Sequence, residues 1–163
     1  MILSRKKFIP RFFIIDLDGV FTDGKFLYSK DGKEFKVFGP DDHDALKALA
    51  SFLEIHVVTA DARGFEISKR RIVDDMNFPL SLVSAKERPT WIESNFNPLQ
   101  TIYMGDGFFD HKVFEKVSYG IAPSDALERT KKCADHITSC GGGERAVTEA
   151  CIHIAKKFFD VSL

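Results

Sequence analysis

The sequence has little of what marks membrane, nucleic-acid-binding or disulfide-stabilised proteins. Its 163 residues contain no apolar run near the roughly 20 residues that cross a bilayer. The basic start, residues 1–11, is not followed by the apolar segment of a secretory signal. The net charge of −1 gives no electrostatic reason to expect nucleic acid or an anionic membrane as a partner. Three cysteines without CxxC spacing favour reduced thiols, and therefore a cytoplasmic protein.

Linkers, repeats and low-complexity segments are also missing. We therefore expect a single domain over residues 1–163, a length that suits one sizeable core. Only the glycine run 141–143 is typical of a flexible joint, and it opens a C-terminal tail at about 141–163.

Short apolar segments alternate with longer amphipathic ones. The pattern predicts strands at 11–17, 54–60, 80–83, 101–106, 117–122 and 135–138, and helices at 41–53, 63–76, from Pro89 and at about 144–159. Such alternation is typical of a parallel sheet between helices, so the predicted fold is a Rossmann-like, three-layer α/β domain. Residues 25–38 predict a small hairpin around Asp31-Gly32, the dipeptide that type I′ turns favour.

Polar side chains stand at the ends of three predicted strands. Asp16 and Asp18 follow the first strand, Thr59 ends the second, and Asp106 ends a later one, with Asp110 four residues on. Ligands of parallel sheets bind outside the carboxyl ends of the strands, so these groups should converge. Carboxylates that close together repel one another unless a cation shares them, and Mg²⁺ suits a site of few hard oxygen ligands.

The spacing of these groups indicates metal-assisted phosphoryl transfer. A carboxylate at a strand end can act as a nucleophile and form an aspartyl-phosphate. A second one, two residues later, can protonate the leaving alkoxide and then activate water. A threonine hydroxyl and a nearby Lys or Arg would hold the phosphoryl oxygens. Each motif alone is more often a turn or a helix cap; their ordered combination favours catalysis.

Three segments together resemble the haloacid dehalogenase superfamily of phosphohydrolases. They are "DLDGVFTD" at 16–23, "VVTA" at 57–60 and "GDGFFD" at 105–110, which are similar to its first, second and fourth motifs. The hairpin segment, "APSDALERTKKCADHIT" at 122–138 and "GGGERAVTEA" at 141–150 are similar to a small subgroup of 3-deoxy-manno-octulosonate 8-phosphate phosphatases and acylneuraminate 9-phosphate phosphatases.

The resemblance implies roles for the strand-end residues. Asp16 would be the nucleophile and a Mg²⁺ ligand, and Asp18 the general acid/base, whose backbone carbonyl also binds the metal. Asp106 would be a further metal ligand, assisted by Asp110, and Thr59 would bind the phosphoryl group.

The same resemblance implies further substrate contacts and an assembly. Gly19, in the first-motif turn, and Arg63, the displaced basic residue of "TADAR", are candidate substrate-binding residues. The third motif of the superfamily supplies a cation near the start of the helix that follows the strand at 80–83. In this sequence that cation is either Lys86 or Arg88. The hairpin would replace a cap domain, and a homotetramer would let neighbouring subunits close the site.

The sequence departs from the family pattern at further places besides "TADAR", including His43, where a small residue is usual. Gly107 stands where close relatives often carry a second Asp, which bears on the metal site. In the tail, Thr148 stands where relatives tend to have Arg, with Arg145 displaced upstream.

Three functional hypotheses follow. The first is a Mg²⁺-dependent phosphatase of a small sugar-acid phosphate, either 3-deoxy-manno-octulosonate 8-phosphate or a nonulosonate 9-phosphate. The alternative is a weakly catalytic or non-catalytic tetrameric module associated with the synthesis of nucleotide-activated sugar acids. A third is a phosphatase of another substrate class, such as a nucleotide or a plain sugar phosphate.

Overall fold

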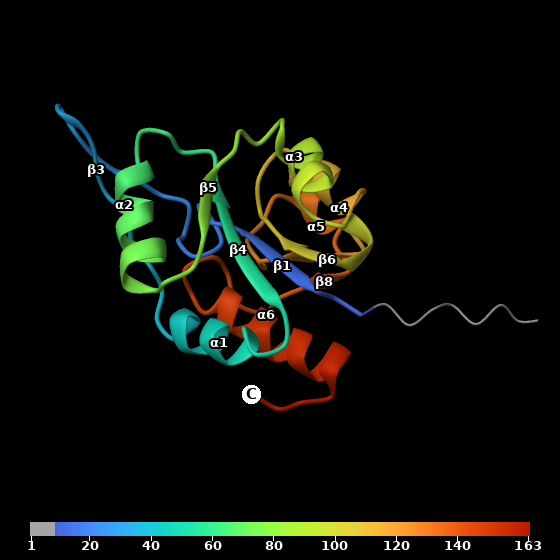
Figure 1. Ribbon diagram of the computed structural model, residues 1–163. Helices are drawn as coiled ribbons and strands as arrows, with labels where there is room; N and C mark the ends of the chain where they lie inside the picture. The colour runs from blue at the N-terminus through green and yellow to red at the C-terminus, as the bar shows by residue number, and fades with distance from the viewer. Residues whose placement is uncertain (1–8) are drawn as a thin grey trace, which may run out of the picture.

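A six-stranded parallel sheet forms the centre of the computed structural model, which describes residues 9–163 (Figure 1). The strand order is β5-β4-β1-β6-β7-β8. The bounds are β1 Phe12–Asp16, β4 Glu54–Thr59, β5 Leu80–Leu82, β6 Thr101–Met104, β7 Tyr119–Ala122 and β8 His136–Ile137. Every predicted strand is therefore confirmed, each slightly shorter than expected. Residues 1–8, which include most of the basic start of the chain, lie outside the described residues, so the structure does not test the expectation about a secretory signal.

The sheet is buried on both faces because its central strands are apolar throughout. Phe13, Ile14 and Ile15 of β1 have no exposed surface. Successive strand residues point to opposite faces, so Phe13 and Ile15 join one core cluster and Ile14 the other. β1 pairs with β4 on one side and β6 on the other, which makes it the central strand from which a site can be built.

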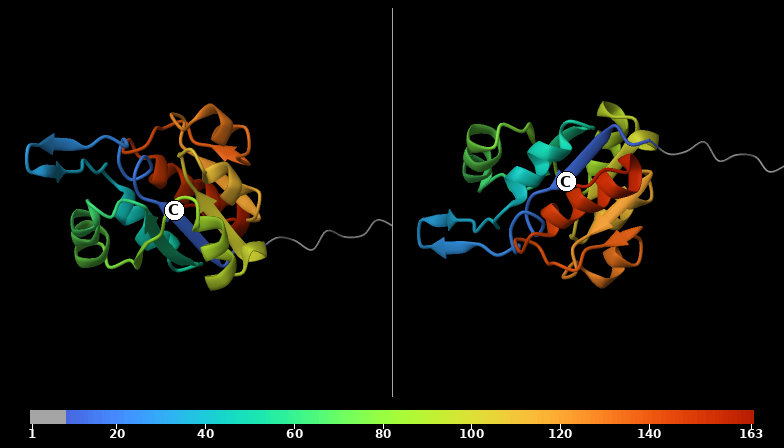
Figure 2. Two further views of the ribbon diagram at one scale, coloured as in Figure 1. Left: turned by 90° about the horizontal axis from the view of Figure 1, so that it is seen from above. Right: turned by 90° about the horizontal axis from the view of Figure 1, so that it is seen from below.

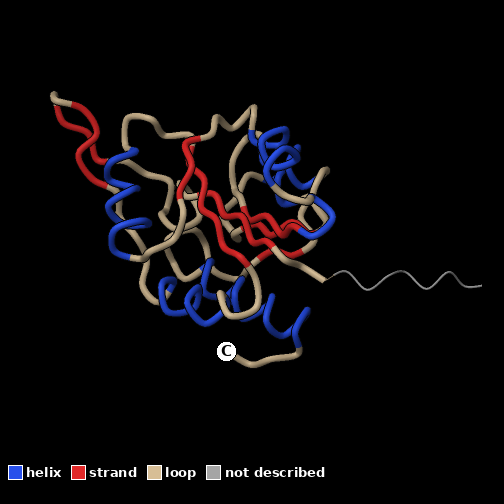
Figure 3. Tube along the Cα trace, in the orientation of Figure 1, coloured by secondary structure: helices blue, strands red, loops and turns tan. Residues whose placement is uncertain are grey.

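Helices cover both faces of the sheet (Figure 3). One layer holds α1 Asp42–Leu49 and α6 Ala146–Ile154, and the other holds α3 Arg88–Asn95, α4 Asp110–Phe114 and α5 Glu128–Lys131 (Figure 1). α2 Phe65–Lys69 continues into the π-helical η1 Arg70–Asp75, and α6 into η3 Ala155–Phe159; η2 Pro98–Gln100 is a 3₁₀ turn. None of the described helices is long and apolar enough to cross a membrane.

The hairpin consists of β2 Leu27–Ser29 and β3 Gly32–Phe35 and projects from the domain (Figure 2). Ser29 pairs with Gly32, so the connection is Lys30-Asp31. Neither connecting residue has the positive φ that a type I′ turn requires, and that expectation is wrong. The reason is that Gly32 supplies the positive φ, +120°, one residue later, at the start of β3.

The glycine run 141–143 is a close-packed segment of the domain, so the expectation of a flexible joint is wrong. A Cβ atom added at Gly142 would lie 2.0 Å from the carbonyl oxygen of Gly19. The amide of Gly143 donates to the carbonyl of Val20 at 3.0 Å, and the amide of Gly142 donates to Asp125 Oδ1 at 2.9 Å. Small residues are needed here because two backbones approach each other.

The altered tail residue Thr148 joins α6 to α1. Its amide and its hydroxyl donate to Asp42 Oδ1 at 3.0 and 2.6 Å. Asp42 is 4% exposed, and burial raises the pKa of its carboxyl although these hydrogen bonds oppose the shift. Arg145 pairs instead with Asp41 at 2.5 Å. Both tail departures thus have partners within the subunit.

Replacing Thr148 by Val should destabilise the domain. The change keeps the side-chain shape but leaves a buried carboxylate with one donor fewer, so we expect the free energy of unfolding to fall by about 1–3 kcal/mol. Urea denaturation measures this. Thr90→Val, on the exposed side of α3, is the matched control and should change it by less than about 0.5 kcal/mol. Equal values for both variants would contradict the proposed link.

Candidate active site

Three carboxylates meet where two neighbouring strands end. Asp16 is the last residue of β1, Asp106 lies two residues beyond β6, and Asp110 begins α4. Because β1 and β6 are parallel neighbours, their ends lie at the same edge of the sheet. One oxygen from each of the three side chains lies within 4.8 Å of the others.

Gly19 makes this convergence possible. It has a φ of +86°, and a Cβ atom added to it would lie 2.1 Å from Asp106 Oδ2. A side chain at this position would therefore displace Asp106. Gly19 acts on the site through the space it leaves.

Arg88, of the two candidate cations, reaches the carboxylates. Its Nη1 lies 2.6 Å from Asp16 Oδ2 and 3.2 Å from Asp110 Oδ1, and donates to the hydroxyl of Tyr103 at 2.7 Å. Its side chain is 1% exposed. Burial alone would lower the pKa of Arg88, but the adjacent carboxylates outweigh it and raise that pKa above its usual value. Lys86 is exposed, with Nζ 5.7 Å from the ring centroid of Phe109.

The site holds more negative charge than its own cation balances. Burial raises the pKa of Asp16 to about 7, although Arg88 opposes this, and burial with the charges of Asp16 and Asp110 raises the pKa of Asp106 to about 8. Asp106 Oδ1 is buried and has no hydrogen-bond partner within the described residues. Three carboxylates and one guanidinium leave a formal charge of −2, so the residues fit a divalent cation.

Asp18 lies in a separate environment, outside this group of carboxylates. The hydroxyl of Thr59 donates to Asp18 Oδ2 at 2.8 Å, and the amide of Asp61 donates to that hydroxyl at 3.1 Å. The ammonium of Lys36 lies 2.7 Å from Asp18 Oδ1. The Asp18 carboxylate therefore does not belong to the group of three clustered carboxylates.

The sequence alone did not identify Lys36 and Tyr103 as residues of the site. Nothing in the sequence separates Lys36 from the other hairpin lysines, because the position of the hairpin against α2 decides its contacts. Tyr103 did carry a signal, since a tyrosine in a buried apolar strand needs a partner for its hydroxyl. That hydroxyl donates to Asp110 Oδ1 at 2.8 Å.

Arg63 and Gly107 complete the set of predicted positions. Arg63 is exposed and makes no hydrogen bond or ion pair with the described residues, so the structure does not bring it to the carboxylates. The amide of Gly107 donates to Asp110 Oδ2 at 2.8 Å. Gly107 adds no carboxylate to the site, and its backbone amide helps to orient Asp110.

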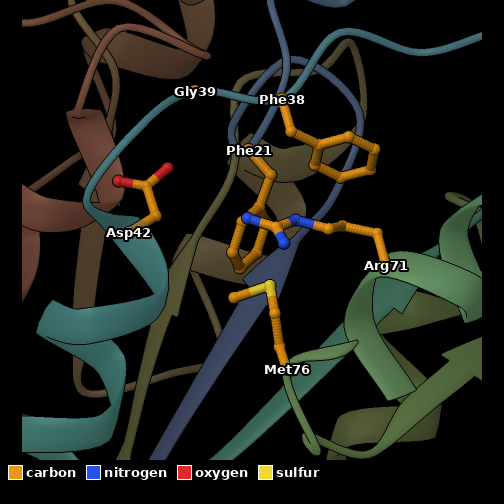
Figure 4. Close-up of a pocket in the computed structure, with 6 residues that line it drawn as sticks. All are labelled: Phe21, Phe38, Gly39, Asp42, Arg71 and Met76. Carbon is orange, nitrogen blue, oxygen red and sulfur yellow. The ribbon is translucent and has the colours of Figure 1, made fainter. Parts of the chain in front are cut away.

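A pocket beside the first-motif loop is shown in Figure 4. It is lined by Phe21, Phe38, Gly39, Asp42, Arg71 and Met76. Arg71 extends into it from η1, with its guanidinium carbon 6.0 Å from the ring centroid of Phe38. None of the three clustered carboxylates lines this pocket, so the pocket is separate from the carboxylate group at the strand ends.

Comparison with known proteins identifies close relatives, although no protein-family model matches the chain. The 3-deoxy-D-manno-octulosonate 8-phosphate phosphatase KdsC of Salmonella typhi is 30% identical over 151 residues, 86% of this chain and 77% of the relative. KdsC of Haemophilus influenzae is 31% identical over 144 residues, 85% of this chain and 79% of the relative.

Solved structures agree with these relatives in fold. The 3-deoxy-D-manno-octulosonate 8-phosphate phosphatase of Moraxella catarrhalis, solved with a magnesium ion, a phosphate ion and KDO, superposes with a TM-score of 0.81 at 26% identity, covering 94% of this chain and 91% of that one. The cobalt-bound phosphatase of Haemophilus influenzae gives a TM-score of 0.82 at 28% identity, covering 95% and 92%.

The carboxylate cluster predicts a pH-dependent response to Mg²⁺. The folded-state pKa values of Asp16 and Asp106 are raised above 3.8, to about 7 and about 8. Without metal, the protonated forms of these two carboxyls stabilise the folded state. Their contribution to the free energy of unfolding is full below about pH 4 and is lost as the pH rises through about 7 to 8. Added Mg²⁺ should raise the midpoint of thermal unfolding more at about pH 8 than at about pH 5.5, because bound protons compete with the metal.

Differential scanning fluorimetry with EDTA or with Mg²⁺ measures this difference. The Asp106→Asn variant should lose most of the Mg²⁺ response at both pH values. A Mg²⁺-induced shift of equal size at the two pH values would contradict the assignment of these carboxylates as ligands.

Proposed function

Because the chain belongs to the KdsC-like phosphatases of the haloacid dehalogenase superfamily, we propose that it is a Mg²⁺-dependent phosphatase of a small sugar-acid phosphate. The observation that carries the proposal is the group of Asp16, Asp106 and Asp110 beyond the ends of β1 and β6, in which Arg88 pairs with Asp16 and Asp110. The names of the relatives support 3-deoxy-D-manno-octulosonate 8-phosphate as the substrate. A nonulosonate 9-phosphate has the same chemistry and is the second candidate.

Asp16 is the proposed nucleophile. Its Oδ1 accepts a hydrogen bond from the amide of Leu17 at 2.8 Å, and Arg88 holds Oδ2, so the carboxylate is fixed. Arg88 also favours the ionised form, which burial disfavours. Attack of a carboxylate oxygen on phosphorus forms an aspartyl-phosphate while the bond from phosphorus to the leaving oxygen breaks.

Asp18 is the proposed proton carrier. It gives its proton to the leaving alkoxide, and then takes one from the water that hydrolyses the aspartyl-phosphate and restores Asp16. Thr59 donates to Asp18 in the structure and is proposed to donate to a phosphoryl oxygen when substrate binds. Gly19 leaves the space that the Asp106 carboxylate occupies. Direct binding of substrate by Gly19 and by Arg63 stays a prediction.

Mg²⁺ is the proposed cofactor. Its ligands would be Asp16, Asp106, Asp110 and the backbone carbonyl of Asp18, which together match the hard oxygen donors that the ion prefers. When bound, Mg²⁺ supplies positive charge that offsets the negative charge of the phosphoryl oxygens.

A homotetramer in the cytoplasm is proposed as the working form. The support is the hairpin, whose Leu27, Tyr28, Phe35 and Val37 are between 57% and 63% exposed. An isolated two-stranded hairpin is marginally stable, and a cluster of exposed apolar side chains marks an interaction surface. A second copy of the chain is the proposed partner of this surface.

The assembly should depend on the hairpin. Analytical ultracentrifugation is expected to give four times the chain mass of 18.4 kDa. Leu27→Glu with Phe35→Glu should shift the protein to smaller species, because two charges would be buried without partners. Leu99→Glu, at an apolar residue that is 74% exposed elsewhere, is the control and should leave the mass unchanged. A wild-type monomer would disprove the proposed tetramer.

The phosphatase should release phosphate only with Mg²⁺ and Asp16. A panel of sugar-acid, sugar and nucleotide phosphates, read out by free phosphate, is expected to give the highest kcat/KM with a sugar-acid phosphate. Asp16→Asn should lower kcat by roughly 10³-fold or more, because the nucleophile is lost. Highest activity on a nucleotide would redirect the substrate assignment, and no turnover of any ester by an intact tetramer would favour the non-catalytic module.

The two third-motif candidates provide the matched control for this assay. Lys86→Met should keep the wild-type rate, because Lys86 is exposed and makes no contact with the carboxylates. Arg88→Met should lower kcat by at least about 10²-fold, because it leaves Asp16 and Asp110 buried without their cation. Equal effects of the two variants would argue against the role of Arg88.

A further inference from the structure

Lys36, the residue that follows β3, has a buried ammonium surrounded by three oxygen atoms. Its side chain has no exposed surface. Its Nζ lies 2.7 Å from Asp18 Oδ1 and 2.9 Å from Asp61 Oδ2, and it donates to Ser68 Oγ at 2.8 Å. Lysine is almost never fully buried unless its charge is paired. Lys36 therefore places a buried, paired cation beside Asp18.

The partners of Lys36 exclude direct binding of substrate by its ammonium. The ammonium donates one hydrogen bond, to Ser68 Oγ, and forms ion pairs with Asp18 and Asp61, while its side chain has no surface exposed to a substrate. Two of these partners are themselves fixed, since Ser68 Oγ donates to the carbonyl of Gly64 at 3.1 Å and Asp61 Oδ1 accepts from the amide of Gly64 at 3.1 Å. Turning Lys36 toward a substrate would leave Asp18, whose side chain is 19% exposed, without its cation.

We propose that Lys36 is a positioning residue for Asp18, an inference that rests on the proposed phosphatase function. Thr59 and Lys36 hold the two oxygens of the Asp18 carboxylate. In the proposed reaction Thr59 also donates to the phosphoryl group, and one hydroxyl proton cannot serve both acceptors. When Thr59 turns to the phosphoryl group, Lys36 is the contact that keeps Asp18 aimed at the leaving oxygen, so that its proton can pass to that oxygen.

Lys33 offers a matched comparison in the same hairpin. It also pairs with Asp61, its side chain is 5% exposed, and its Nζ lies 3.4 Å from the ring centroid of Phe26. It makes no contact with Asp18. Loss of either lysine removes a cation from Asp61, but only the loss of Lys36 releases the Asp18 carboxylate.

The test compares Lys36→Met with Lys33→Met on the ester that the wild-type enzyme hydrolyses best. Lys36→Met should lower kcat about 10- to 100-fold, because a mispositioned acid loses much of its contribution. Its KM should stay within about twofold, because Lys36 does not touch the substrate. Lys33→Met should lower kcat by less than about threefold. In an Asp18→Asn background, Lys36→Met should cause no further loss, since its effect passes through the missing carboxylate.

Further variants keep the test decisive. Lys30→Met, at a side chain 87% exposed on the same hairpin, should behave as wild type. Ser68→Ala removes one hydrogen-bond partner of Lys36 with little loss of volume and should lower kcat a few-fold. This variant replaces Lys36→Met in the test if circular dichroism shows that Lys36→Met is unfolded.

Three outcomes would overturn the role of Lys36: a raised KM with unchanged kcat, a full additional loss in the Asp18→Asn background, or unchanged kcat in the folded Lys36 and Ser68 variants. Inactivity of the wild-type protein toward every ester would instead overturn the proposed function.

Discussion

The buried ion pairs of Arg88 with Asp16 and Asp110 are the interaction on which the site depends. They join the end of β1 to the starts of α3 and α4, so three segments from different parts of the chain meet at one guanidinium. Removing one partner from a buried pair typically costs about 3–5 kcal/mol, because the other charge stays in the interior. Arg88 pairs with only two of the three clustered carboxylates, so Asp106 lacks a cation of the protein and the site still fits a divalent cation.

Asp16 and Asp18 are one residue apart yet have different neighbours. Asp16 faces Arg88 and the acidic group, whereas Asp18 contacts Thr59 and Lys36. Different surroundings let two identical side chains take different parts in the proposed reaction, one at phosphorus and one at the leaving oxygen.

The hairpin links the site to the surface of the domain. Its lysines Lys33 and Lys36 contact Asp61 and Asp18, while several of its apolar side chains are exposed. In the proposed tetramer, a subunit that binds the exposed side chains would therefore act on the position of Lys36. A short hairpin can in this way replace a separate cap, because it supplies both a buried charge and a surface for a second subunit.

The sequence by itself determined the sheet, its strand ends and the carboxylates that stand there. Apolar runs and helical spacing depend on neighbouring residues, so β1 with Asp16 and β6 with Asp106 could be predicted from local pattern. Only the tertiary structure showed that Arg88 contacts the carboxylates, that Lys36 contacts Asp18, and that the glycine run packs against the first-motif loop. The physical reason is that these contacts join residues far apart in the chain, such as Asp16 and Arg88, which are 72 positions apart, so the relative placement of whole segments decides which groups meet.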